Sequence, residues 1–226
     1  MEGDIFATKG LEYLLVILYF ALLIGMALAL APRRAPVAAT AKRPLLRPAT
    51  WFALADGYHF HQGHSWAADA DGGVLTVGLD DFAAQFVGPP DALALPAVGA
   101  RVQQGEVAWR LGAGERTLPM LSPVEGEVVA VNADVMAAPK LATEDPYGRG
   151  WLFQVRPSNW PVALRNLLSG EVARAWIGAT VEQLRRTPGA ELGVLMPDGG
   201  APMPGFGRVL GPEEWRTAAR EFFLTG

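Results

Sequence analysis

From Trp51 onward, hydrophobic residues recur in short runs that glycine, proline and aspartate interrupt. Along residues 123–132 the side chains alternate between two largely apolar faces, as in a buried strand, and Gly126 allows a bulge or the close approach of another backbone. Residues 107–111 are a second β-prone run, and the glycine-containing segment 112–116 joins the two. This arrangement predicts a β-hairpin.

The same pattern predicts a domain with many short strands and few helices. The expected strands are 58–60, 65–67, 74–79, 92–95, 107–111, 118–121, 124–131 and 151–155. The expected helices are 80–86, 161–168 and 169–176, and Asp80 or Asp81 is a suitable N-cap for the first. Short strands separated by turn residues are typical of a β-sandwich or barrel, so we expect a mainly β domain over residues 51–177.

Residues 13–31 are apolar and uncharged throughout. As a helix this stretch is roughly 28 Å long, close to the thickness of the hydrocarbon core of a bilayer. A cleaved signal peptide is an alternative, but signal peptides begin with positive charge, whereas Glu2 and Asp4 open this chain. We therefore predict a single transmembrane helix after a short N-terminal segment, residues 1–12.

The linker that follows, residues 32–50, combines four prolines with five basic residues: Arg33, Arg34, Lys42, Arg43 and Arg47. Positive charge after the helix predicts a bacterial-type inner-membrane protein with its N-terminus outside and the folded domain in the cytoplasm. The basic residues either attract anionic membrane lipid or serve only to set the topology. Within the helix, Ala21 and Gly25 are small enough to allow close packing against another membrane helix.

Several motifs of the β domain keep the order and spacing of one known family. They are His64-Ser65-Trp66, LPAVG at 95–99, SPVEGEVVAVN at 122–132 and DPYGRGWL at 145–152. On these motifs, residues 57–176 resemble the glycine cleavage system H protein and its biotinyl- and lipoyl-carrier relatives. The resemblance implies a barrel-sandwich hybrid fold, and a module that docks onto larger proteins.

In that family a lysine at a hairpin tip carries lipoate on a swinging arm, eight residues before a proline that corresponds here to Pro123. That position is Glu115, and Arg116 follows it. Neither can form the lipoyl amide, since a carboxylate is no amine and a guanidinium stays protonated. The three lysines of the chain, Lys9, Lys42 and Lys140, lie elsewhere. We expect no lipoyl group and no other cofactor, and keep a carrier or regulator in lipoate or glycine metabolism as an alternative.

All three histidines fall within residues 58–64. On a strand His59 and His61 share one face, and a turn at Gly63 can bring His64 back toward them. Two or three imidazoles that converge are a possible metal or redox site. No cysteine completes such a set, and His64 already belongs to the family motif. We therefore expect no bound metal and keep a histidine-based metal module as the second alternative.

The C-terminal extension, residues 178–226, has helical signals of its own. Thr180 is a suitable cap for a short helix over 180–186, and residues 193–197 are strand-like. Residues 212–224 predict a helix with proline in its first turn and one apolar stripe, made of Trp215, Ala218, Ala219, Phe222 and Phe223. The stripe either packs on the β domain or docks on another subunit, in which case Trp215, Phe222 and Phe223 are partner contacts.

Composition narrows the function further. The 226 residues carry a formal net charge of −4 and no cysteine, which argues against nucleic-acid binding and excludes disulfides and thiolate chemistry. No nucleophile, phosphate-loop or metalloprotease motif is present, so we expect neither an enzyme nor a small-molecule substrate. The sequence predicts a non-catalytic, single-pass accessory or scaffolding subunit of a larger membrane complex, with a respiratory or photosynthetic assembly as the expected host.

Overall fold

The computed structural model describes residues 13–19, 22, 26, 45, 46, 51–186 and 202–225. The chain divides into two compact units, Met1–Ala39 and Thr40–Gly226. In the first unit, residues 13–19 are helical and their side chains are exposed. Within the described residues no helix combines the length and the apolar character needed to cross a membrane.

Most of the transmembrane helix predicted over residues 13–31 lies outside the described residues. The same is true of Ala21 and Gly25, and of Arg33 and Arg34 in the linker. These predictions therefore stay predictions.

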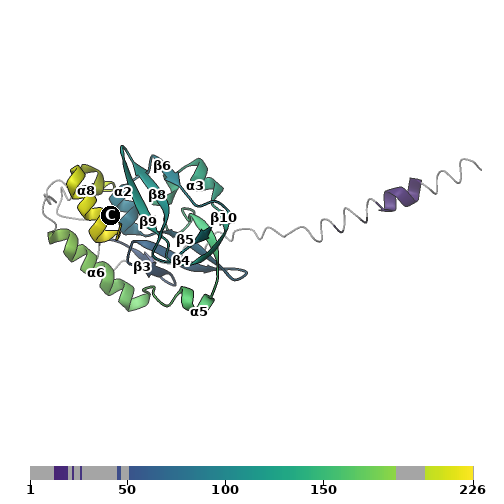
Figure 1. The fold of residues 1–226 in the computed structure, drawn as a ribbon, viewed down its shortest axis with the longest axis horizontal. Helices are drawn as coiled ribbons and strands as arrows, with labels where there is room; N and C mark the ends of the chain where they lie inside the picture. Colours follow the sequence, from purple (N-terminus) through teal and green to yellow (C-terminus); the bar gives the residue numbers. More distant parts are fainter. Residues whose placement is uncertain are drawn as a thin grey trace, which may run out of the picture. The chain divides into compact units, whose positions relative to one another are not determined.

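The second unit contains antiparallel sheets (Figure 1). The largest has the strand order β3-β4-β5-β11-β10-β7, with bounds His59–His61, Ser65–Ala70, Val74–Leu79, Phe153–Pro157, Gly126–Val131 and Arg101–Val102. A three-stranded sheet has the order β6-β8-β9, with bounds Ala92–Ala94, Val107–Ala113 and Arg116–Leu121. Strand β1 (Leu45–Leu46), which lies in the predicted linker, pairs with β2 (Leu54–Ala55) in the β domain. The unit is mainly β, as the strand pattern predicted.

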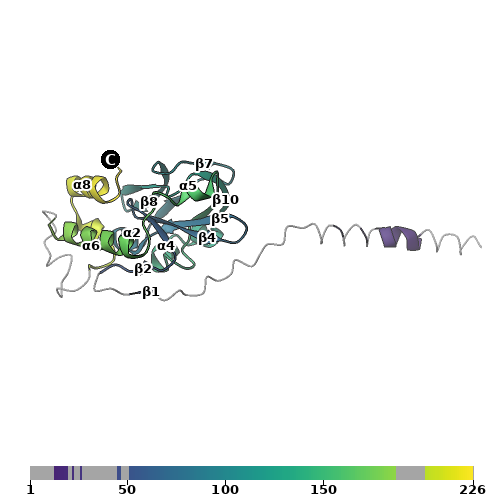
Figure 2. The ribbon, with the colours of Figure 1, turned by 90° about the horizontal axis from the view of Figure 1, so that it is seen from below.

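Short helices connect the strands, and longer ones follow them. They are α2 (Asp81–Val87), α3 (Ala133–Ala137), α4 (Leu141–Glu144), α5 (Trp160–Ala163), α6 (Gly170–Arg186), the 3-10 helix η1 (Phe206–Val209) and α8 (Pro212–Phe222). Figures 1 and 2 show α6 and α8 at the same end of the unit as α2. This end is therefore largely helical, whereas the remainder contains the sheets with the short helices α3 and α5.

The hydrophobic core combines side chains from both larger sheets. Trp109 on β8 meets Phe153 on β11 edge to face, with ring centroids 5.4 Å apart. Trp66 on β4 lies against Gly78 on β5, where an added Cβ would come within 2.3 Å of the indole ring. Its Nε1–H donates to the carbonyl of Leu79 at 2.7 Å. Glycine is thus required at position 78 because the ring fills the space that a side chain would take.

The second strand of the hairpin is not the one that the sequence predicted. β8 pairs with β9, and the turn between them contains only Gly114 and Glu115. β10, expected as the second arm, instead pairs with β11 and β7 in the six-stranded sheet. The prediction failed because residues 116–121 form a strand of their own that returns before 126–131 begins.

Gly126 allows the close approach of another backbone, and the bulge lies farther along the strand. Its φ is 153°, and an added Cβ would lie 2.2 Å from the carbonyl oxygen of Arg156 on β11. The register between β10 and β11 also shifts between Val128 and Ala130, as at a bulge. The close approach of the β11 backbone is possible only without a side chain.

The C-terminal half corrects the helices predicted over 161–168, 169–176 and 180–186. The helices expected over 169–176 and 180–186 are one helix, α6, and Thr180 lies inside it with its hydroxyl donating to the carbonyl of Trp176 at 3.2 Å. The helix expected over 161–168 is only the four-residue α5. The strand expected over 193–197 lies outside the described residues. Helix α8 begins at Pro212 as predicted and ends at Phe222.

Candidate functional site

The turn of the hairpin β8–β9 contains the position that the resemblance assigns to the cofactor-bearing lysine of the family. Ala113 and Arg116 face each other across the two strands, so Gly114 and Glu115 form a two-residue turn. Gly114 has a φ of 64°, which glycine adopts at no steric cost, and its N–H donates to the Asp91 carboxylate at 2.5 Å. Both turn residues are exposed. Glu115 therefore reaches solvent at the hairpin tip.

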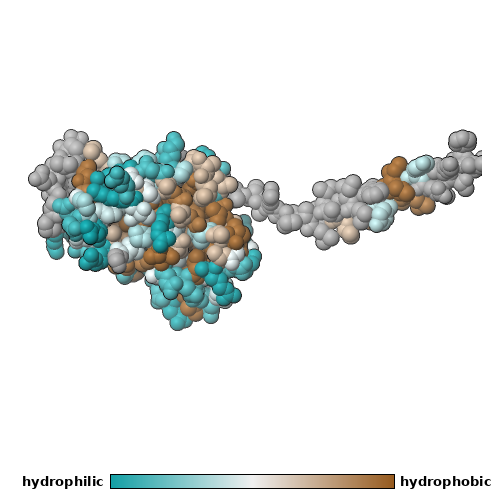
Figure 3. All heavy atoms as spheres, turned by 45° about the horizontal axis from the view of Figure 1, so that its top comes forward, coloured by the Kyte–Doolittle hydropathy of each residue, from teal (hydrophilic) through white to brown (hydrophobic). Residues whose placement is uncertain are grey.

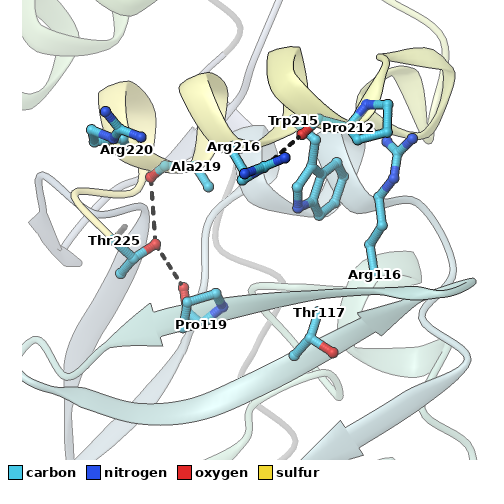
Figure 4. A pocket seen from close by; sticks show the side chains of 9 residues that line it. All are labelled: Arg116, Thr117, Pro119, Pro212, Trp215, Arg216, Ala219, Arg220 and Thr225. Carbon is cyan, nitrogen blue, oxygen red and sulfur yellow. Dashed lines mark hydrogen bonds between the residues drawn. The ribbon is translucent and has the colours of Figure 1, made fainter.

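Helix α8 packs on the same hairpin. The guanidinium carbon of Arg116 lies 5.4 Å from the ring centroid of Trp215, and the hydroxyl of Thr225 donates to the carbonyl of Pro119 at 3.3 Å. Between the helix and strand β9 a cavity of about 380 Å³ remains (Figure 4). Its lining combines arginines (Arg116, Arg216, Arg220), apolar residues (Pro119, Pro212, Trp215, Ala219) and threonines (Thr117, Thr225).

The apolar stripe of α8 faces inward. Trp215, Phe222 and Phe223 are 5%, 3% and 0% exposed, so the partner contacts predicted at these residues are corrected: they are core residues of this chain. Phe86 on α2 meets Trp215 and Phe223 with centroid distances of 5.1 Å and 5.0 Å. Helix α2 thus holds α8 in place, because its aromatic side chains supply the complementary apolar surface.

The three histidines do not converge on one point. His64 is buried, and its Nδ1 lies 2.7 Å from the Asp80 carboxylate. The Nδ1 of His61 instead accepts from the N–H of Gly63 at 3.0 Å. Within the described residues no three His, Cys, Asp or Glu side chains are grouped as a metal site would need. His59 shares the outer face of β3 with His61, as predicted, since Phe60 between them is buried.

The turn after β3 differs from the expectation in one detail. The residue with a left-handed backbone is His64, with a φ of 61°, and not Gly63. Gly63 matters for space, because an added Cβ would lie 3.1 Å from both His61 Nδ1 and the carbonyl oxygen of Phe223. Partial burial, and to a smaller extent the neighbouring His64, lower the pKa of His61 below its ordinary value of 6.5.

Asp80 joins the turn to helix α2. One carboxylate oxygen meets His64, and the other accepts from the N–H of Ala83 at 2.9 Å as the N-cap of α2, which confirms the predicted cap. The His64 ring stacks on Phe82 with centroids 4.1 Å apart. Close by, burial raises the pKa of Tyr147 well above 10.0, and the carboxylates of Asp80 and Asp81 add to this. These groups stabilise the fold: His64, Asp80 and Phe82 are buried, and Asp81 and Tyr147 are half-buried.

Other apolar side chains also reach the surface. Val98 and Val172 are 64% and 62% exposed, and hydrophobic residues gather over part of the face drawn in Figure 3. Exposed apolar residues are common on soluble domains, so they do not by themselves mark a binding site.

A family model described as the glycine cleavage H-protein matches residues 58–179, just over half of the 226 residues. The match includes the hairpin β8–β9 and most of α6. The chain belongs to the glycine cleavage H-protein family. Helix α8 and η1 lie beyond the part that matches the family.

Curated members of the H-protein family resemble this chain over the same region. The glycine cleavage system H protein of Streptomyces coelicolor (strain ATCC BAA-471 / A3(2) / M145) is 37% identical over 120 residues, which is 53% of this chain and 94% of that protein. The probable glycine cleavage system H protein of Pyrococcus abyssi (strain GE5 / Orsay) is 31% identical over 120 residues, 53% of this chain and 89% of that protein.

A solved structure is similar as well. The crystal structure of a glycine cleavage system H protein from Mycobacterium marinum shares 27% sequence identity and a TM-score of 0.49, and covers 56% of this chain and 98% of its own.

The sequence assigned Glu115 and Arg116 to the family's cofactor position, and both lie at the end of the hairpin. That they replace the lysine stays a prediction. The sequence did not connect Arg116 with Trp215, or indicate Arg216 and Arg220 as parts of the same site. The apolar stripe of α8 signalled that this helix is buried, but no local pattern indicates which surface it covers.

Proposed function

We propose that this chain is a non-catalytic accessory or scaffolding subunit of a larger membrane assembly, with an H-protein domain that carries no lipoyl group. One observation carries the proposal. The hairpin β8–β9 has Glu115 at its exposed tip and no lysine anywhere in residues 107–123, and the chain's own helix α8 packs against it at Arg116.

The chemistry of attachment supports the first part of the proposal. A lipoyl amide needs the amine of a lysine, and neither a carboxylate nor a guanidinium can replace it. Among the described residues the sole lysine is Lys140, the residue before α4, and its Nζ lies 3.6 Å from the Glu144 carboxylate. That position is on another element, and nothing relates it to the hairpin tip.

The packing of α8 supports a structural role. The resemblance implies a carrier hairpin whose swinging arm must stay accessible to the larger proteins on which the module docks. Here one flank of β9 already binds the chain itself, through the Thr225 contact to Pro119 and the Arg116 contact to Trp215. Such a hairpin serves as an internal docking surface instead of a shuttle.

The membrane part of the proposal rests on sequence. Residues 13–31 are apolar and uncharged, and basic residues without an acid follow them in 32–50. We propose that this segment spans the membrane once and leaves the H-protein domain in the cytoplasm. The small residues Ala21 and Gly25 then allow contact with other membrane subunits.

Neither alternative gains a specific observation. A lipoyl carrier would need an amine at position 115, and the described histidines provide no grouped ligand set for a metal module.

Intact-mass measurement of the full chain, purified from cells that lipoylate their own proteins, tests the cofactor part. We expect the mass of the unmodified chain, with the Streptomyces coelicolor H protein, expressed alongside, as the positive control. An added lipoyl group mapped to residues 107–123 would refute the proposal.

Mild-detergent extraction followed by native sizing tests the assembly part separately. We expect the chain to co-migrate with membrane-protein subunits at a fixed ratio. Migration as a single 24.1 kDa chain would refute the accessory role while leaving the missing lipoyl group untouched.

A further inference from the structure

The cavity between α8 and β9 has the charge pattern of an anion site. Three arginines line it, Arg116 from the hairpin and Arg216 and Arg220 from the helix, and no acidic residue does. Arg216 is partly neutralised because it pairs with Glu213 at 2.5 Å on its outer side. With Arg116 and Arg220 not neutralised in this way, the lining has a net positive charge. The cavity volume of about 380 Å³ is within the range of small-molecule pockets.

An unpaired side-chain nitrogen of Arg116 is a second observation, which does not depend on the shape of the cavity. Its Nη1 is buried and has no hydrogen-bond partner within the described structure. A buried donor without an acceptor is unfavourable, and more so when it carries charge. The aromatic face of Trp215 compensates only in part, because a ring accepts no directed hydrogen bond comparable to that of an oxygen.

The charges of the first turn of α8 do not provide that acceptor. The Arg116 guanidinium lies beside this turn, as Figure 4 shows with Pro212 and Trp215. Glu213 and Glu214 lie in the turn and offset the partial positive charge of the helix N-terminus, and Glu213 pairs with Arg216. Glu214 folds back toward Gly211, where its carboxylate occupies the space of a missing Cβ, yet it does not satisfy Arg116 Nη1.

The lining also identifies what the anion is attached to. Beside the arginines lie Trp215, Pro119 and Ala219, which present apolar surface and no acceptor side chain. A free inorganic ion would leave that surface in contact with water, whereas a molecule with an apolar body would cover it. A planar guanidinium matches a carboxylate in a bidentate arrangement.

We propose that this cavity is a binding site for a small carboxylate with a short apolar body. The carboxylate pairs with the guanidinium groups of Arg116 and Arg220, which line the cavity, and the apolar body lies against Trp215 and Pro119. The site joins the hairpin to α8, so its ligand stabilises the packed helix. This inference goes beyond the accessory role and does not depend on it.

Calorimetric titration of the full chain in lipid nanodiscs, with empty nanodiscs as the blank, tests the site. The probe is 3-phenylpropionate, and the neutral comparison is 3-phenylpropanamide, which has the same ring and chain. We expect saturable binding at one site per chain for the carboxylate, at least about tenfold weaker binding of the amide, and weaker binding at high salt. No binding of the carboxylate, or equal binding of both, overturns the proposal.

Variants locate the binding. Arg116→Met keeps the packed stem and removes the charge, and we expect affinity to fall by at least about tenfold. Arg220→Met changes an exposed helix residue that cannot unfold the domain, and we expect a smaller loss. The matched control is Arg110→Met, since Arg110 is exposed on β8 and does not line the cavity.

Two further outcomes overturn the proposal. One is an equal loss of affinity in Arg110→Met and Arg116→Met, because the binding would then reflect overall charge. The other is tighter binding of inorganic phosphate, or of an acidic peptide, than of 3-phenylpropionate. Those results would assign the cavity to a phosphate group or to a protein partner.

Discussion

Two regions of the same compact unit differ in how their buried polar groups are paired. One region is the segment made of β3, β4, β5 and α2, and the other is the hairpin β8–β9. In the first, His64 pairs with Asp80, Asp80 caps α2, and Trp66 donates to a backbone carbonyl. Among the described residues, the two buried side-chain nitrogens without a partner are Trp109 Nε1 and Arg116 Nη1. Both belong to the hairpin.

The buried polar groups of the first segment therefore stabilise the fold, whereas two of those in the hairpin do not. The first segment is closed and fully hydrogen-bonded where it is buried, which is how a stable protein interior is built. In the hairpin, Glu115 stands where the resemblance predicts the family's lysine, and helix α8 covers one flank. A buried donor without a partner in a native structure calls for an explanation of its own, and a bound anion is one explanation.

The largest expected effect is the release of α8 from the hairpin. Trp215→Ala removes a 5%-exposed indole that packs on Phe86 and Arg116, and we expect unfolding stability to fall by about 3–5 kcal/mol. Chemical denaturation followed by far-UV circular dichroism measures the change. Glu221→Ala on the exposed side of the same helix is the control, within about 0.5 kcal/mol of the parent. An unchanged midpoint for Trp215→Ala would mean that α8 does not hold the hairpin.

The second effect concerns the closed segment. Asp80→Ala removes the N-cap of α2 and leaves His64 Nδ1 buried without its partner, and we expect a loss of about 2–4 kcal/mol. Asp80→Asn keeps an acceptor for the cap and is expected to lose less. Asp71→Ala in the exposed turn after β4 serves as the control. If Asp80→Asn were as damaging as Asp80→Ala, the cap would contribute nothing and the pair with His64 everything.

Local signals predicted the closed segment well. Residues 74–79 form β5 with the predicted bounds, and Asp80 caps the next helix, because strand alternation and capping act within a few residues. The start of α8 at Pro212 follows from the same kind of signal. The failure at Thr180 has a local cause too: a threonine hydroxyl inside a helix bonds the carbonyl four residues back, and the sequence pattern does not distinguish this from a cap.

The candidate site could be predicted only in part. Glu115 and Arg116 were found through the family motif, because its spacing to Pro123 fixes the hairpin position. The partner of Arg116 is Trp215, far away along the chain, and their contact depends on how α8 packs against α2. Neither periodicity nor motif spacing carries that information. The orphaned nitrogen of Arg116 is likewise a property of the packed structure alone.

The third prediction contrasts the hairpin with the closed segment directly. Arg116→Met removes a buried donor that has no acceptor and keeps the apolar stem beside Trp215, while the cation–π contact is lost. The two effects oppose each other, so we expect stability to change by less than about 1 kcal/mol in either direction. Denaturation in the absence of any carboxylate measures it. A loss as large as that of Asp80→Ala would show that Arg116 is a structural residue like Asp80, and would remove the contrast between the two regions.

The smallest expected effect is a pH dependence at the edge of the closed segment. Partial burial, and then the neighbouring His64, lower the pKa of His61 below 6.5 in the folded chain. As the pH falls below 6.5, the unfolded chain binds a proton at this position before the folded one does. Stability present above pH 6.5 is therefore lost as the pH falls toward the folded pKa.

His61→Gln removes the imidazole that binds this proton, so the stability of the variant should decline less steeply between neutral pH and pH 5 than that of the parent. The slopes are compared, and not the absolute values, because the substitution also removes the acceptor of the Gly63 N–H. Equal slopes would mean that His61 titrates alike in both states and that the outer face of β3 is as open to water as the unfolded chain.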